Sequence, residues 1–310
     1  MKVLVLGAGA TGGYFGGRLS EAGRDVSFLV RERRAALLRA NGLVIRSPQG
    51  NTRLKPRICV GTVRETFDVV VLACKAYDLD SALKAITPAV GPDTTILPLL
   101  NGLHHYKALD AHFGAERVLG GLCSIGVTLA SDGAVEHLSP MHMLRYGERD
   151  GSVTPRIAAL DALFAGVKAD AKCSHDILQA LWEKWIMLAS LAGMTCLMRA
   201  NIGEILATPD GRAIMQRYIK TSMAIAAAAG YPPRPAVVER FEKILGSTGL
   251  SLTASMLRDL EGGGEVEADH IVGFMLAKAR EYRIDDSLIA VAYTHLKAYQ
   301  NRRAANRLPK

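Results

Sequence analysis

The first half of the chain alternates short apolar runs with stretches of helical character. Four runs hold at most one charged residue each, as expected of strands covered on both faces of a sheet: Val3–Leu6, Asp25–Val30, Asp68–Cys74 and Thr94–Leu100. The segment Asp80–Ile86, between the last two runs, is typical of a helix. This alternation predicts an α/β fold with a mostly parallel, doubly wound sheet.

Two further regions have β-like patterns. Leu43–Arg46 and Arg57–Val60 flank the turn-forming residues Pro48–Asn51, and we expect a turn-linked hairpin or edge pair there. Gly120–Tyr146 holds short apolar pieces around Asp132-Gly133, which favours an antiparallel extension of the sheet. From Asp176 onward the spacing is helical, so the sequence predicts an all-α C-terminal domain with later helices starting near Pro235 and Asp286.

The first apolar run leads directly into a glycine-rich turn. This turn has the spacing G-x-G-x-x-G over residues Gly7, Ala8, Gly9, Ala10, Thr11 and Gly12. Gly7 permits a tight turn, Gly9 lets the backbone approach a pyrophosphate, and Gly12 lets the following helix pack closely on the strand. The N-terminus of that helix attracts an anion. In this strand–turn–helix context the motif predicts a Rossmann-type dinucleotide-binding domain; the alternative is a glycine-rich turn without a ligand.

The residue after the second strand bears on the choice of dinucleotide. Enzymes that use NAD place a carboxylate there for the ribose 2′-hydroxyl, whereas this chain has Arg31. A guanidinium suits a 2′-phosphate, so we expect NADPH. Two alternatives stay open: a shift of the strand end by one residue would bring Glu32 to that position, and Arg31–Arg34 could be a solvated helix start.

Composition narrows the class of protein. The chain has 310 residues, 49% of them hydrophobic, which is enough for two domains with a substantial core. The net charge of +8 fits an enzyme that handles an anionic cofactor and substrate. We expect no nucleic-acid partner, because several of the charges fall in a short C-terminal segment typical of a solvated tail: Arg302, Arg303, Arg307 and Lys310.

The sequence also predicts where the protein resides. The uncharged stretch Trp185–Met198 is about 14 residues long, short of the roughly 20 that a membrane helix needs, so we expect a buried core helix and no membrane partner. No signal peptide is expected, since the N-terminus is itself a core strand. Five scattered cysteines without C-x-x-C spacing are typical of reduced thiols in a cytoplasmic protein. The histidine spacing does not indicate a metal site.

Three polar residues are candidates for chemistry. Lys75 directly follows the third strand and Asn101 the fourth, at the carboxyl edge of the sheet where ligands gather. Lys184 lies in the tryptophan-flanked stretch Leu181–Leu188, and its ammonium could donate a proton. Each has a structural alternative: a loop residue for Lys75, an Asn-Gly turn for Asn101, and a helix lysine whose stem reaches solvent for Lys184.

Taken together, these motifs resemble the ketopantoate reductase (2-dehydropantoate 2-reductase) family over essentially the whole chain. The resemblance lies in GAGATG at the N-terminus, Arg31, VLACKAYD around Lys75, LLNG around Asn101 and LWEKW around Lys184. It continues through Gly203-Glu204 and the block SMLRDLEGGGEVEADHIVGFML, residues Ser255–Leu276. The family implies reduction of ketopantoate to pantoate with NADPH, a step of pantothenate biosynthesis, by an NADP-binding Rossmann domain (residues 1–173) and a helical substrate and catalytic domain (residues 174–310).

The resemblance also implies roles for individual residues. Lys184 would donate the proton to the carbonyl oxygen, and Arg31 and Lys75 would contact the cofactor together with the glycine-rich turn. Asn101 would contact both cofactor and substrate, and Ser255 the substrate. Glu267 would act near the nicotinamide ribose and Lys184. From the residues alone, Glu265, Glu267 and Asp269 could equally be an acidic helix start.

The chain departs from the family at three positions. Members usually carry asparagines four and eight residues after the lysine and another just before the Gly-Glu pair; here these are Leu188, Ala192 and Ile202, with Asn201 adjacent to the last. Fewer amides leave a more apolar wall, which discriminates less for hydroxyl groups. Three hypotheses therefore stand: reduction of ketopantoate, a paralogue that reduces another 2-oxo acid or ketone, and a non-catalytic NADPH-binding sensor. The partner is a small 2-oxo acid, and a homodimer remains open.

Overall fold

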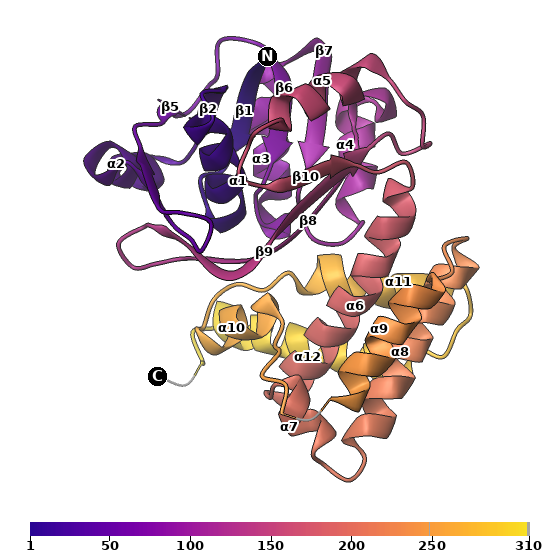
Figure 1. Ribbon diagram of the computed structural model, residues 1–310. Coiled ribbons are helices and arrows are strands. Elements are labelled where there is room, and N and C mark those ends of the chain that lie inside the picture. Colours follow the sequence, from indigo (N-terminus) through magenta and orange to yellow (C-terminus); the bar gives the residue numbers. More distant parts are fainter. Residues whose placement is uncertain (248, 309–310) are drawn as a thin grey trace. The chain divides into compact units, whose positions relative to one another are not determined.

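The computed structural model describes residues 1–247 and 249–308, which form two compact units (Figure 1). The N-terminal unit comprises Met1–Leu100 and His105–Ile177, and the helical unit comprises Asn101–His104 together with the chain from Leu178 onward. The short segment Asn101–His104 thus belongs with the helices, although it follows a strand of the N-terminal unit. Lys310, one of the charges expected in the C-terminal tail, lies outside the described residues.

The first sheet of the N-terminal unit is parallel and confirms the predicted α/β class. Its strands are β1 (Lys2–Leu6), β2 (Asp25–Leu29), β5 (Arg57–Cys59), β6 (Phe67–Leu72) and β7 (Val90–Pro98). They stand in the order β5-β2-β1-β6-β7, so the strand order reverses between β1 and β6. Ligands of doubly wound sheets bind at the carboxyl ends of the strands at this point. In each of the central strands β1, β2 and β6 every residue but one is buried, as their apolar runs predict.

Helices connect the strands of this unit. They are α1 (Ala10–Glu21), α2 (Glu32–Asn41), α3 (Leu79–Ile86), α4 (His105–Phe113) and α5 (Pro155–Phe164), with short 3₁₀ turns η1 (Ala76–Asp78), η2 (Thr87–Ala89) and η3 (Ala115–Arg117). The predicted helix over Asp80–Ile86 corresponds to α3.

A second sheet corrects two predictions. Its strands are β3 (Leu43–Arg46), β4 (Thr52–Leu54), β8 (Gly120–Leu129), β9 (Val135–Gly147) and β10 (Asp170–Cys173). The expected pairing of residues 43–46 with 57–60 is wrong: β3 pairs with β4, while β5 joins β2 in the first sheet. A hairpin closes over a short turn, so β3 pairs with the first segment after Pro48–Asn51, which is β4. The polar sequence of β4 carries little strand signal. The antiparallel pair β8–β9 is not an extension of the parallel sheet but belongs to the second one.

Helix α1 packs between these two sheets through glycines. A Cβ on Gly16 would lie 2.7 Å from the Phe28 ring of the parallel sheet, and one on Gly17 would lie 2.6 Å from Ile45 of the second sheet. Glycines one position apart point to opposite neighbours, because successive helical residues are turned by about 100°. The lack of side chains on both faces lets α1 sit close to both sheets.

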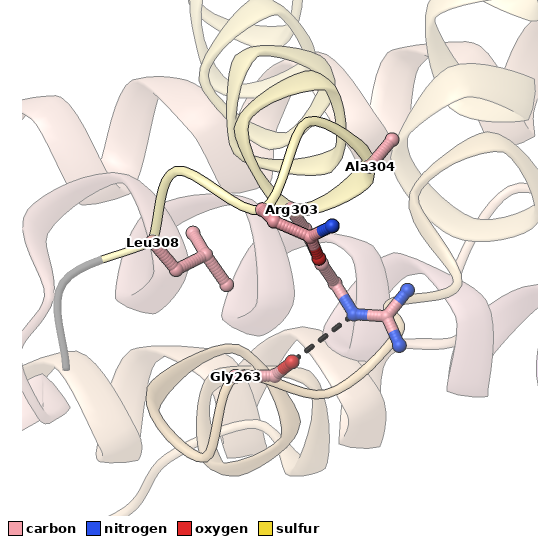
Figure 2. A pocket seen from close by; sticks show the side chains of 5 residues that line it. Gly263, Arg303, Ala304 and Leu308 are labelled. Carbon is pink, nitrogen blue, oxygen red and sulfur yellow. Dashed lines mark hydrogen bonds between the residues drawn. The ribbon is translucent and has the colours of Figure 1, made fainter.

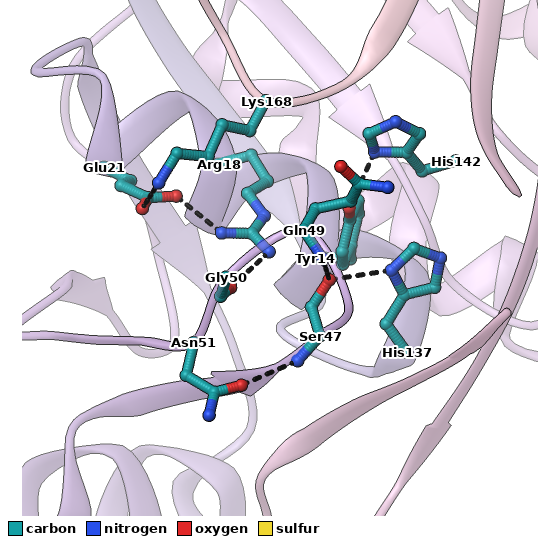
Figure 3. Close-up of polar contacts among 10 residues, drawn as sticks. All are labelled: Tyr14, Arg18, Glu21, Ser47, Gln49, Gly50, Asn51, His137, His142 and Lys168. Atoms are coloured by element: carbon teal, nitrogen blue, oxygen red, sulfur yellow. Dashed lines mark hydrogen bonds and ion pairs between the residues drawn. The ribbon is translucent and has the colours of Figure 1, made fainter. Parts of the chain in front are cut away.

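Polar contacts tie α1 to the second sheet (Figure 3). The fully buried Arg18 donates to Glu21 at 2.7 Å and to the carbonyl of Gly50, in the β3–β4 turn, at 2.8 Å. One turn earlier, the Tyr14 hydroxyl lies 2.9 Å from Nδ1 of His142 on β9. These contacts hold the helix that follows the glycine-rich turn from the side opposite the parallel sheet.

The described part of the helical unit contains helices and no strands, which confirms the all-α prediction. Its helices are α6 (Ile177–Met198), α7 (Ile202–Leu206), α8 (Gly211–Ala228), α9 (Pro235–Gly246), α10 (Ser255–Glu261), the π-helix η4 (Asp269–Gly273), α11 (Phe274–Glu281) and α12 (Ser287–Ala304). Helices α9 and α12 begin where Pro235 and Asp286 predict. Arg302 and Arg303 lie in the last turn of α12 rather than in a tail. Among the described helices, none combines the length and apolar character that a membrane crossing requires.

Candidate functional site

The glycine-rich turn connects β1 to α1 at the carboxyl edge of the parallel sheet. Gly7 has a φ of +93°, a conformation that side chains strongly disfavour. A Cβ on Gly12 would overlap the carbonyl oxygen of Gly7, whereas a Cβ on Gly9 would meet nothing within 4 Å. Thus Gly7 and Gly12 are required by the fold itself. Gly9 is not, and it leaves open space beside the turn.

Gly9 is the N-cap of α1 and has no side chain that could accept a hydrogen bond from the N–H groups of the first turn. The first α1 hydrogen bond runs from the N–H of Gly13 to the carbonyl of Gly9 at 2.8 Å. The N–H groups of Ala10, Thr11 and Gly12 belong to the first turn, which lacks partners within a helix. Free N–H groups beside open space at a positive dipole end fit a pyrophosphate, so the turn can hold a dinucleotide.

The segment that leads to Lys75 passes beside this turn. Lys75 is two residues after Ala73, whose Cβ would stand 3.0 Å from a Cβ on Gly12. Lys75 is the N-cap of η1, so the backbone turns there and leaves the sheet edge. The structure therefore brings the segment of Lys75 together with the glycine-rich turn at the point where the strand order reverses.

Arg31 is the N-cap of α2, two residues after β2 ends at Leu29. Its side chain is 74% exposed and donates to Asp78 at 2.5 Å. This hydrogen bond raises the pKa of the guanidinium above its ordinary value. Glu32 is the first residue of α2 and accepts a hydrogen bond from Arg39 at 2.6 Å, so the strand end does not shift to bring Glu32 to the position of Arg31.

Arg34 contacts the glycine-rich turn, which the sequence patterns did not predict. Its Nε donates to the carbonyl of Ala8 at 2.8 Å and its Nη1 to that of Gly133 at 2.7 Å. Arg34 thereby links α2 to the glycine-rich turn and to the β8–β9 hairpin, so it is not part of a solvated helix start. Its position three residues after Arg31, on the same helical face, was the available signal.

Lys184 and Asn101 meet in the helical unit. The Nζ of Lys184, on α6, donates to Oδ1 of Asn101 at 3.0 Å. The segment after Asn101 is fixed by Gly102, which has a φ of +81° and whose Cβ would lie 3.1 Å from the carbonyl oxygen of His270. Next to Lys184, the fully buried Trp185 donates its indole N–H to the carbonyl of Ile271 at 3.3 Å. The residues that follow Asn101 and Lys184 therefore both pack against the same π-helix.

Glu267 is 8% exposed and lies two residues before that π-helix. Side chains of α12 donate hydrogen bonds to backbone carbonyls of residues 263–266, the segment that precedes Glu267. Arg303 donates to Gly263 at 3.0 Å, as Figure 2 shows at the rim of a surface pocket, and Tyr299 donates to Gly264 at 2.7 Å. Gln300 donates to Val266 at 3.1 Å. Glu267 is thus held in a defined backbone, not in a freely solvated acidic helix start.

Asp269 behaves differently from Glu267. Its carboxylate accepts from Tyr293 at 2.5 Å and from Lys297 at 3.0 Å, both on α12. Burial acts to raise the pKa of Asp269, but these two hydrogen bonds outweigh it and the pKa is lowered. Asp269 therefore anchors the start of the π-helix to α12.

The remaining predicted site residues also lie in the helical unit. Ser255 is half-buried and is the first residue of α10. Leu188 is half-buried, whereas Ala192 and Ile202 are fully buried. Asn201 caps α7: its side chain accepts from the N–H of Glu204 at 2.9 Å, and Glu204 in turn accepts from the N–H of Asn201 at 2.8 Å. The side-chain oxygen of Asn201 therefore serves helix capping.

Glu183, the residue before Lys184, connects α6 to Arg234. Glu183 is buried and accepts hydrogen bonds from the backbone N–H and Nε of Arg234, both at 2.9 Å, and from Gln179 at 3.0 Å. Burial acts to raise the pKa of Glu183, but these hydrogen bonds outweigh it, so the pKa falls below its ordinary 4.5. A carboxyl with a lowered pKa in the folded state stabilises the fold above pH 4.5, and this stabilisation is lost as the pH falls through the folded-state pKa.

Glu183→Gln is therefore expected to lower the free energy of unfolding by about 1–3 kcal/mol at neutral pH. The difference from wild type should shrink in acid, because wild-type Glu183 then also becomes neutral. Urea unfolding at pH 7 and below pH 4.5 measures both values. Asp285→Asn, which removes an exposed pair with Arg217, is the matched control and should cost less than about 1 kcal/mol. An equal deficit of Glu183→Gln at both pH values would contradict the role given to the carboxylate.

The structure thus distributes the predicted site residues over both units. The N-terminal unit holds the glycine-rich turn, Arg31 and Lys75; the helical unit holds Asn101, Lys184, Ser255 and Glu267. Within the first unit the turn and the Lys75 segment are brought together, and within the second Lys184 contacts Asn101.

Comparison with known proteins shows which family the chain resembles. Residues 3–151 match the family model of ketopantoate reductase PanE/ApbA, and residues 176–300 match that of its C-terminal domain. The chain is 40% identical over 300 residues to the uncharacterized oxidoreductase YkpB of Bacillus subtilis, covering 97% of this chain and 99% of the relative. It is 28% identical to a 2-dehydropantoate 2-reductase of Halobacterium salinarum, covering 92% and 94%.

Solved structures agree. The crystal structure of 2-dehydropantoate 2-reductase from Geobacter metallireducens superposes with a TM-score of 0.85 at 28% identity, covering 96% of this chain and 99% of that one. Both halves of the chain are therefore matched by one family, and the resemblance inferred from the motifs is confirmed: this chain belongs to the ketopantoate reductase family of oxidoreductases.

Proposed function

We propose that this protein is an NADPH-dependent reductase of 2-oxo acids in which Lys184 donates the proton. The hydrogen bond from Lys184 to Asn101 carries the proposal. A protein that only bound a dinucleotide would need the glycine-rich turn but no oriented ammonium. Here Lys184 is aimed at an amide oxygen, in a unit that also holds the buried carboxylate of Glu267. We propose that the two units divide the work, with the cofactor on the N-terminal unit and the catalytic lysine on the helical unit.

The residues of the chain account for the chemistry. When bound, a reduced nicotinamide supplies the hydride that reduces the carbonyl carbon. The N–H groups of the glycine-rich turn hold the pyrophosphate, and Lys75 adds a positive charge beside them. Asn101 orients the ammonium of Lys184 toward the carbonyl oxygen. Lys184 stabilises the negative charge that develops on this oxygen and transfers a proton to it, which yields the 2-hydroxy acid. Glu267 is assigned to the nicotinamide ribose and to the surroundings of Lys184.

Arg31 supports NADPH as the cofactor. It occupies the position beyond β2 where a carboxylate would bind the ribose diol of NADH, and its exposed guanidinium remains accessible although it donates to Asp78. A guanidinium offers several N–H donors, so one contact with Asp78 leaves others for a 2′-phosphate.

The substrate is the finer question. Ketopantoate is the substrate that the family name implies, but Leu188, Ala192 and Ile202 replace three asparagines, and the side-chain oxygen of Asn201 is used in a helix cap. These observations favour the second candidate, a 2-oxo acid with an apolar side chain and fewer hydroxyl groups. A site without hydrogen-bonding groups discriminates weakly for hydroxyls and accepts apolar groups readily.

The test is steady-state oxidation of NADPH at 340 nm with ketopantoate and a panel of apolar 2-oxo acids, with NADH in parallel. We expect turnover with NADPH, a higher kcat/KM for an apolar acid than for ketopantoate, and at least about a tenfold preference for NADPH over NADH. Arg31→Ala should abolish that preference by weakening NADPH alone. Efficient turnover of ketopantoate above all others would assign the family activity instead, and binding of NADPH without turnover of any acid would refute the reductase.

A further inference from the structure

The carboxylate that is missing after β2 in the sequence is supplied in the folded N-terminal unit by another segment. Asp78 ends η1, directly before α3, and its Oδ1 accepts a hydrogen bond from Arg31 at 2.5 Å. Strands β2 and β6, which lead to these two residues, flank β1 in the parallel sheet. The ion pair therefore spans the carboxyl end of β1, where the glycine-rich turn begins.

The backbone fixes Asp78 independently of Arg31. Its N–H donates to the carbonyl of Lys75 at 2.9 Å, and its carbonyl accepts from the hydroxyl of Ser81 at 2.8 Å. The side chain is 31% exposed. Among the residues that the structure describes, only Oδ1 of this carboxylate accepts a hydrogen bond, from Arg31. Oδ2 is therefore an acceptor for a ligand on a backbone that is already in place.

The ion pair has two roles that do not involve recognition of a hydroxyl group. It could tie η1 to the start of α2, or it could orient the guanidinium of Arg31 for a phosphate. Stability accounts poorly for the pair, because the side chain of Arg31 is 74% exposed and exposed ion pairs contribute little. Orientation for a phosphate conflicts with the sign of the charge on Asp78.

The position of Asp78 matters because its carboxylate touches the guanidinium that we assign to the adenosine ribose. A phosphate oxygen that accepts a hydrogen bond from Arg31 lies no more than about 8 Å from the carboxylate, given the size of a guanidinium and an ordinary hydrogen-bond length. This distance is about the Debye length at physiological ionic strength, so salt does not fully screen the repulsion. NADH carries a neutral hydroxyl there, which donates to a carboxylate.

We propose that Asp78 determines how strongly the protein discriminates between the two dinucleotides: it accepts the ribose 2′-hydroxyl of NADH and opposes the 2′-phosphate of NADPH. This inference rests on the proposed cofactor site. Arg31 favours NADPH and Asp78 favours NADH, so the observed preference is the difference between the two effects. The protein then binds both dinucleotides and prefers NADPH less than Arg31 alone would dictate.

The test compares dissociation constants of NADPH and NADH, measured by fluorescence quenching, for wild type and Asp78→Asn. The variant should bind NADPH about threefold tighter and NADH about threefold weaker, which raises the preference for NADPH about tenfold. In about 1 M salt the gain for NADPH should shrink, because the Debye length falls to about 3 Å.

Asp80→Asn is the matched control. Asp80 is exposed in the first turn of α3, two residues after Asp78. Two helical residues are turned by about 200°, so Asp80 points away from the side of Asp78. Its substitution removes the same charge and should leave the ratio of the two dissociation constants within about twofold of wild type.

Two fragments isolate the adenosine end from the nicotinamide. Adenosine 2′,5′-bisphosphate and 5′-AMP differ only by the 2′-phosphate, and calorimetry with both should reproduce the opposite shifts in Asp78→Asn. Weaker binding of NADPH by this variant would show that Asp78 orients Arg31 for the phosphate, and an equal change for both dinucleotides would show a tie between segments. Either result overturns the proposal, as does an unchanged ratio or a wild type that binds neither dinucleotide.

Turnover separates this inference from the proposed reductase function. If Asp78→Asn shifts the two affinities in opposite directions but wild type reduces no 2-oxo acid, the reductase function fails and the role of Asp78 stands. If wild type reduces 2-oxo acids and the ratio of affinities does not depend on Asp78, the reductase function stands and the role of Asp78 fails.

Discussion

Lys184→Ala is expected to lower kcat for reduction by about 10²–10⁴-fold, the range of a positioned general acid. The hydride produces negative charge on the carbonyl oxygen, and without the ammonium no other group is assigned to neutralise it. The hydrogen bond of Lys184 to Asn101 at 3.0 Å orients the donor before the substrate arrives, so water is a poor substitute. Single-turnover oxidation of NADPH at saturating 2-oxo acid measures the loss directly.

Two controls define that result. NADPH affinity, followed by quenching of its fluorescence, should stay within about threefold, because the glycine-rich turn and Arg31 lie in the other unit. Lys220→Ala removes an exposed lysine of α8 and should leave kcat unchanged. A kcat of Lys184→Ala within about threefold of wild type would remove the lysine from the mechanism and favour the NADPH-binding sensor instead.

Substitutions at Gly9 and Gly12 should separate cofactor binding from folding. A methyl group on Gly9 meets open space in the protein, so Gly9→Ala should lose only the preference of an N-cap for glycine over alanine, about 1 kcal/mol or less. That methyl would stand where a pyrophosphate approaches the backbone, and the overlap should weaken NADPH by about 10–100-fold. Gly12→Ala places its methyl against the carbonyl of Gly7 and should lower the free energy of unfolding by about 3 kcal/mol and abolish measurable NADPH binding.

Urea unfolding and NADPH titration of both variants measure these two effects separately. The pair is informative because each variant adds one methyl group to the same turn. Wild-type affinity of Gly9→Ala for NADPH would show that the phosphates do not approach the turn. A substantial loss of stability in Gly9→Ala would show instead that this residue, like Gly12, is required by the fold.

Features that depend on local chemistry can be predicted from the order of the residues alone. Apolar runs such as Val3–Leu6 predict buried parallel strands because no polar position interrupts them, and the glycine spacing predicts the turn because only glycine tolerates a φ of +93° at Gly7. The long motifs around Lys75, Asn101 and Lys184 are specific enough to indicate the family, which the comparisons confirm.

Local patterns in the sequence do not predict which distant segments pair. The polar strand β4 shows little alternation of apolar and polar residues, so its pairing with β3 in the second sheet is visible only in the structure. In the same way, the assignment of Asn101–His104 to the helical unit follows from Gly102 packing against His270, more than 160 residues away in sequence.

Which polar groups come together depends on how the chain folds. The side-chain oxygen of Asn201 caps α7, the carboxylates of Glu183 and Asp269 accept hydrogen bonds from neighbouring elements, and the rings of His104 and His270 meet. The physical reason is that a hydrogen bond or ring contact acts over a few ångströms. The sequence determines which groups are present, and the fold decides which of them come within that range.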